Sequence, residues 1–68
     1  METAYEDFFR DLVITIQMNI LELKERKNFA DPEELPHIDV KLLTYEEVLS
    51  ILRDSADEFK IPKAEFGL

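Results

Sequence analysis

The stretch TAYEDFFRDLVITIQMNILELKERK, residues 3–27, decides the fold because it carries the signals of one long, capped helix. Thr3 stands three places before Glu6, which is the spacing of a capping box: the Thr oxygen accepts a hydrogen bond from a free N–H of the first turn. Acidic residues follow in that first turn and basic residues close the stretch, an order that complements the helix dipole. The sequence therefore predicts a helix from about residue 4 to residue 27.

Apolar residues in this helix fall on two stripes, because successive side chains turn by about 100°. The main stripe consists of Tyr5, Phe9, Leu12, Val13, Ile16, Ile20 and Leu23. A second stripe lies on nearly the opposite side and consists of Ile14, Met18 and Leu21. A helix that is apolar on two sides is normally covered on both, so the second stripe predicts an interaction of its own.

The connector after residue 27 contains a second capping box, formed by Asp31 and Glu34. It predicts a short helical turn at about 32–35, and Pro36 is expected to end that turn. Residues 37–43, HIDVKLL, alternate apolar and polar side chains, which predicts an extended segment and leaves open whether it is a strand or a loop. The apolar side chains expected to pack across the helices are Ile38, Val40 and Leu42.

A third capping box, Thr44 with Glu47, predicts a second amphipathic helix over about 45–60. Pro62 is expected to end it, because the residue before a proline is pushed away from helical angles. The tail, residues 61–68, is expected to form one more turn with Phe66 as an apolar anchor. The apolar stripe of the second helix consists of Tyr45, Val48, Leu49, Leu52, Ala56 and Phe59. The predicted fold is a single all-α domain over residues 1–68, a small helical hairpin.

The chain is small for a domain that must be stable alone. Its 68 residues include no cysteine, so neither a disulfide nor a thiolate metal site can add stability. Covering the second stripe would remove about 250 Å² of apolar surface, on the order of 6 kcal/mol before entropy is counted. We therefore expect a homodimer, or a helical protein partner, at that stripe. The alternative is that the connector folds around Ile14, Met18 and Leu21 and buries them within the monomer.

Charge and composition exclude several classes of function. The net charge is −8 and the pI about 4.4, whereas nucleic-acid binders carry a basic stripe, so direct nucleic-acid binding is not expected. The apolar run of residues 12–23 is interrupted by polar residues and shorter than a membrane span, so no membrane association is expected. The N-terminus lacks the cationic region of a signal peptide. The expected location is cytoplasmic.

Catalytic and cofactor chemistry also find no support in the sequence. His37 is the only histidine and has no partner at metal-ligand spacing, and one glycine cannot build a phosphate-binding loop. We therefore expect no catalytic, metal or cofactor site and no enzymatic activity. The leading prediction is a protein–protein interaction module that associates with itself through the second stripe.

An acidic surface provides the alternative function. A helix that presents carboxylates in place of phosphates could occupy the nucleic-acid site of a basic partner and inhibit it. The residues that would carry this charge on the second helix are Glu46, Glu47, Asp54, Asp57 and Glu58. The acidity has a simpler explanation in solubility.

Overall fold

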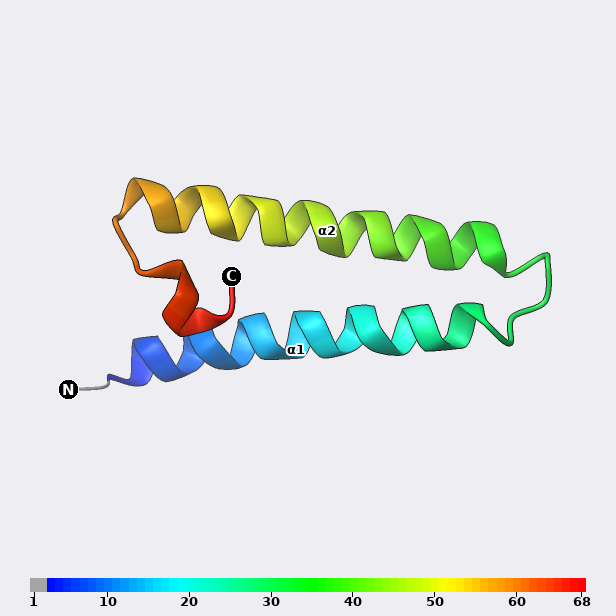
Figure 1. Cartoon of the computed structure of the whole chain (residues 1–68), viewed down its shortest axis with the longest axis horizontal. Helices are drawn as coiled ribbons and strands as arrows, with labels where there is room; N and C mark the ends of the chain where they lie inside the picture. Colours follow the sequence, from blue (N-terminus) through cyan, green and yellow to red (C-terminus); the bar gives the residue numbers. More distant parts are fainter. Residues whose placement is uncertain (1–2) are drawn as a thin grey trace.

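Two long helices and one short helix make up the computed structural model, which describes residues 3–68 (Figure 1). Helix α1 spans Ala4–Lys27, α2 spans Leu35–Glu58, and the 3₁₀ helix η1 spans Lys63–Phe66. The α-helices run antiparallel along each other, and η1 folds back against them at the open end of the hairpin. The predicted all-α helical hairpin is confirmed, and residues 3–68 contain no strand.

Helix α1 begins and ends where its capping signals predict. Thr3 has extended backbone angles, and its hydroxyl oxygen accepts a hydrogen bond from the Glu6 N–H at 3.2 Å. The helix ends at Asn28, whose N–H donates to carbonyls of the last turn. Just before that end, the Lys27 ammonium lies 2.7 Å from the Asp39 carboxylate and so joins the two helices at the closed end of the hairpin.

Helix α2 begins at Leu35 rather than after Thr44, so the extended segment predicted for 37–43 and the predicted helix start at about residue 45 are both wrong. Pro36 lies in the first turn, where its missing N–H would have had no intrahelical partner. It therefore begins the helix instead of ending the turn before it. The Ile38 N–H already donates to the carbonyl four residues earlier, at 3.0 Å.

The other two capping boxes do not start helices. The Asp31 carbonyl accepts from the Glu34 N–H at 2.9 Å, in a turn that leads directly into α2. Thr44 lies inside α2, and its hydroxyl donates to the Val40 carbonyl at 2.9 Å. A threonine in a helix interior commonly makes this bond to the carbonyl four residues earlier, so the spacing of a capping box does not distinguish a helix start from a helix interior.

The helical period also changes which side chains of residues 37–43 share a face. Ile38 is buried and Leu42 is half-buried, whereas Val40 is exposed. Residues four apart lie on one face of a helix, but a residue midway between them lies on the opposite face. The predicted packing is therefore confirmed for the first two residues and wrong for Val40.

The core is a single layer of apolar side chains between the helices. The buried members are Val13, Ile16 and Ile20 from α1, Ile38, Leu49 and Ala56 from α2, and Phe66 from η1. Burial of Phe66 confirms that the tail is anchored by this residue. Tyr5 and Leu12 were predicted in the main stripe and Phe59 in the stripe of α2, but all three are exposed. Two helices touch along only one line, which is narrower than the stripes that the sequence offers.

Helix α2 ends in a Schellman motif whose left-handed position is occupied by a lysine. Glu58 is its last residue, and Lys60 has a φ of 57°. The Ile61 N–H donates to the Ala56 carbonyl at 2.8 Å and the Lys60 N–H to the Asp57 carbonyl at 3.2 Å. This pair of bonds defines the motif, which normally has glycine at the position of Lys60.

Lys60→Gly is therefore expected to raise the free energy of unfolding by about 0.5–1 kcal/mol, because glycine removes the clash of a side chain in the left-handed region. The matched control is Lys24→Gly, which places glycine in a right-handed helix and is expected to destabilise by a similar amount. Urea unfolding followed by circular dichroism at one protein concentration measures both changes. Destabilisation by both substitutions would contradict the prediction.

The molecule is unusually extended for its size. Its extents are 47 × 20 × 16 Å and its radius of gyration is 14.4 Å, compared with about 11 Å for a compact chain of this length. The accessible surface is 5423 Å², roughly 1,000 Å² more than a typical monomer of this mass exposes. No helix in residues 3–68 has the length and apolar character needed to cross a membrane.

Candidate functional site

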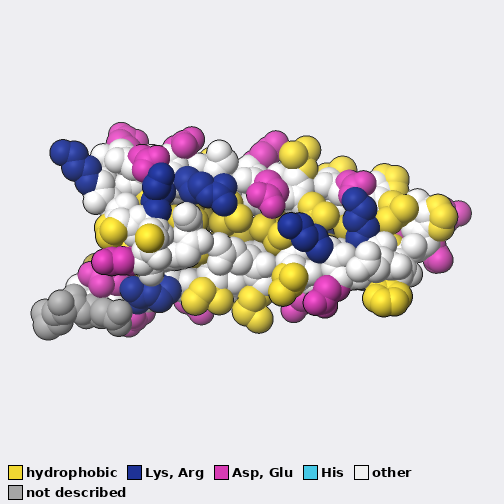
Figure 2. Space-filling view, in the orientation of Figure 1, with side chains coloured by type: hydrophobic (Ala, Val, Ile, Leu, Met, Phe, Trp, Pro, Cys, Tyr) yellow, Lys and Arg dark blue, Asp and Glu magenta, His cyan; other side chains and the backbone are white. Residues whose placement is uncertain are grey.

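The predicted second stripe of α1, here called the outer stripe, lies on the side of α1 that faces away from α2. Its residues Ile14, Met18 and Leu21 are 47%, 57% and 59% exposed. Figure 2 shows hydrophobic side chains along the lower edge of the hairpin, where α1 runs. The connector turns toward α2, and η1 contacts both helices at the open end, so neither covers this stripe. The stripe is therefore uncovered within the monomer.

The outer stripe is an apolar centre between acidic ends. Along the same face of α1, the stripe is preceded by Asp11, three residues before Ile14, and followed by Glu25, four residues after Leu21. Ile14 precedes Met18 by four residues and Leu21 follows it by three, so the stripe is nearly symmetric about Met18. Its three side chains together expose on the order of 300 Å², within the range of a functional surface patch.

The five acidic residues predicted on α2 are all exposed, but they do not form one continuous row. Glu47, Asp54 and Glu58 lie on the outer side of α2, whereas Glu46 and Asp57 lie on a flank. The Asp57 carboxylate is 2.7 Å from the Lys63 ammonium. Figure 2 shows Lys and Arg side chains close to acidic ones on the face in view, and α2 itself carries two cations, Lys41 and Arg53. The five carboxylates are therefore spread over two sides of α2 and do not form an unbroken row.

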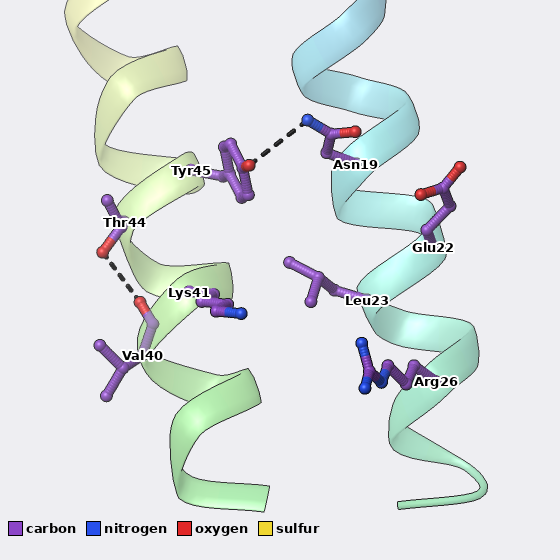
Figure 3. A pocket seen from close by; sticks show the side chains of 8 residues that line it. All are labelled: Asn19, Glu22, Leu23, Arg26, Val40, Lys41, Thr44 and Tyr45. Atoms are coloured by element: carbon purple, nitrogen blue, oxygen red, sulfur yellow. Dashed lines mark hydrogen bonds between the residues drawn. The ribbon is translucent and has the colours of Figure 1, made fainter. Parts of the chain in front are cut away.

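A groove between the two helices near the closed end was missed by the sequence reasoning. It has a volume of about 590 Å³. Its lining residues are Asn19, Glu22, Leu23, Arg26, Val40, Lys41, Thr44 and Tyr45. Figure 3 shows Arg26 and Lys41 extending toward each other from opposite helices, with Leu23 between the helices. The groove forms only because α2 begins at Leu35. The sequence did not predict it because the alternating pattern of residues 37–43 indicated an extended segment there.

One hydrogen bond closes the groove toward the middle of the hairpin. The Asn19 side-chain amide donates to the Tyr45 hydroxyl at 3.3 Å (Figure 3). Both residues are half-buried. This polar contact joins α1 and α2 at the end of the groove, beside the two cations.

Potential metal ligands and polar side chains lie outside the core in the part of the chain that the structure describes. His37 is exposed on α2. No group of three or more His, Cys, Asp or Glu side chains within residues 3–68 is placed to hold a metal ion. Over the same residues, no polar or charged side chain is buried. The described surface therefore offers apolar contacts and scattered charges.

Comparison with known proteins adds no assignment. No protein-family model, no curated protein and no solved structure is found to match the chain.

Proposed function

We propose that this protein is a non-enzymatic protein–protein interaction module that associates with itself through the outer stripe of α1. The observation that supports the proposal is the exposure of Ile14, Met18 and Leu21 in the middle of a helix whose opposite side is already packed. Apolar side chains at helical spacing favour contact with another helix. Such a contact adds stability to a two-helix domain, whose small core buries little apolar surface.

The symmetry of the stripe suggests how two copies meet. In an antiparallel pair of α1 helices, a two-fold axis passes beside Met18, and Ile14 of one copy faces Leu21 of the other. Methionine suits the position on the axis because its unbranched side chain adapts to an identical neighbour. The same geometry brings Asp11 of one copy near Glu25 of the other. This repulsion limits the affinity at low salt.

Met18→Glu is expected to halve the mass of the wild-type assembly while the helical content stays the same. The reason is that the substitution places two carboxylates against each other in an apolar contact, where they lose hydration without gaining a partner. Sedimentation equilibrium at micromolar concentration measures the mass, and far-UV circular dichroism measures the helicity.

Ser50→Glu is the matched control because it adds the same charge at an exposed position on α2. It is expected to leave the mass unchanged. A monomeric wild type, or an assembly that Met18→Glu leaves intact, would contradict the proposed function.

A further inference from the structure

A second uncovered surface extends from the groove along the whole hairpin. In α1, steps of three and four residues lead from Arg26 and Asn19 back to Leu12, Phe8 and Tyr5. In α2, the same steps lead from Lys41 and Thr44 forward to Val48, Ile51, Ser55 and Phe59. Side chains at this spacing lie along one side of a helix. Because the groove places the starting residues of both helices together, we call this two-helix surface the groove face.

The two ends of the groove face differ in chemistry. The closed end carries the groove with Arg26 and Lys41. The open end carries Tyr5, Phe8 and Phe59, which are 86%, 68% and 73% exposed and which we call the aromatic end.

Helix η1 borders Tyr5 at a second, smaller hollow but leaves that ring exposed, and η1 packs on the side of α1 away from Phe8. The Phe66 ring contacts Phe9 and lies 5.1 Å from the Arg10 guanidinium carbon, and the Gln17 amide donates to the Gly67 carbonyl at 2.7 Å. Arg10 and Gln17 project from the side of α1 away from Phe8 and Leu12.

We propose that the groove face binds a second copy of this chain in the reverse direction, so that the aromatic end of each copy enters the cationic groove of the other. The two-fold axis then passes near residue 17 of α1. Phe8 of one copy lies opposite Arg26 of the other, and Leu12 lies opposite Glu22. The result is a four-helix bundle made from two hairpins.

Charge selects the reverse direction over the alternative. If both copies pointed the same way, Arg26, Lys41 and Glu22 of both chains would meet at the closed end, and four cations would be brought together with only two carboxylates. In the reverse direction, each pair of cations lies over aromatic rings, whose faces attract them. A groove of about 590 Å³ has room for such side chains, since it lies within the usual size range of binding pockets.

The exposed area also favours a contact larger than the outer stripe. A stable interface buries about 800 Å² on each partner. The outer stripe exposes on the order of 300 Å², whereas the whole chain exposes roughly 1,000 Å² more than a compact monomer. The groove face adds apolar area from both helices. Its two-fold axis and that of the outer stripe both pass near residues 17–18. The two surfaces lie on neighbouring sides of the hairpin, so the axes run roughly at right angles and the two contacts together close a tetramer and do not form an open chain.

Disulfide trapping tests the reverse orientation directly, because the chain contains no cysteine. Leu12→Cys and Glu22→Cys are mixed under mild oxidation. The disulfide between the two variants is expected to form at least about tenfold faster than either homodimer, since residues 12 of the two copies are about 15 Å apart along the bundle, beyond the reach of a disulfide. If the disulfide-linked homodimers form as fast as the mixed disulfide, the reverse orientation is overturned.

Mass measurements test the surface itself and separate it from the outer stripe. Wild type is expected to be a tetramer, and Phe8→Glu a dimer of unchanged helicity. Leu43→Glu is the control, because it alters an equally exposed apolar residue on the other side of α2; it is expected to remain a tetramer.

This inference would be overturned, and the proposed function would stand, if wild type is a dimer that dissociates in Met18→Glu but not in Phe8→Glu, and if the mixed disulfide does not form. A dimer that only Phe8→Glu dissociates would support the groove face and overturn the outer stripe.

Discussion

Replacing Phe66 by alanine is expected to lower the free energy of unfolding by about 3–4 kcal/mol, the cost of removing a buried aromatic ring. Phe66 is 8% exposed, and its ring packs edge-on against Phe9 with the centroids 4.8 Å apart. Helix η1 contacts both α1 and α2, so this ring joins the helices at the open end. Urea unfolding of the full chain at one fixed concentration measures the loss.

Phe29→Ala is the matched control, because Phe29 is 89% exposed in the connector. Its removal is expected to change the free energy of unfolding by less than about 0.5 kcal/mol. Equal effects of the two substitutions would show that η1 does not hold the open end together.

Ile38→Asp is expected to destabilise the chain by at least about 3 kcal/mol, whereas Val40→Asp is expected to change stability by less than about 1 kcal/mol. Ile38 is 5% exposed and Val40 is 63% exposed. Both positions lie near the N-terminus of α2, so an aspartate gains the same attraction to the helix dipole at either one. Val40 also lines the groove, so both variants are compared in a Phe8→Glu background, in which the groove contact with a second copy is absent. The difference between them then measures burial within the hairpin.

This pair of variants also tests the backbone of residues 37–43. In an extended segment the two side chains would point to the same side and the two substitutions would have similar effects. Similar losses of stability, measured by thermal and urea unfolding, would contradict a helix that begins at Leu35. Unchanged circular dichroism in Val40→Asp is the corresponding positive result.

Helix α2 begins earlier than the sequence predicts because burial of apolar side chains contributes more free energy than the capping signal at Thr44. Ile38 and Leu42 are two residues from Val40 in the alternating pattern, but they are four residues from each other. The pattern therefore fits both a strand and a helix. A capping box contributes about 1 kcal/mol, whereas burial of one isoleucine contributes about 1.5–3 kcal/mol. Contact with α1 thus outweighs the local signal at Thr44.

The candidate surfaces were predictable to different degrees. The outer stripe needed only the start of α1 and the helical period, so the sequence was sufficient to find it. Predicting the groove and the aromatic end requires knowing how α2 is aligned along α1. The hydrogen bond between Asn19 and Tyr45 is one of the contacts that reveal this alignment. Such pairs join residues far apart in the chain, and no local pattern identifies them.

By itself, the sequence determined that the chain is helical, where α1 begins and ends, and which residues form its two apolar stripes, because capping and periodicity act within a few neighbouring residues. Only the tertiary structure decided where α2 begins and which apolar side chains stay uncovered. The physical reason is that two helices share a single line of contact. Which residues it buries depends on the register of α2 against α1, and the remaining apolar faces stay exposed.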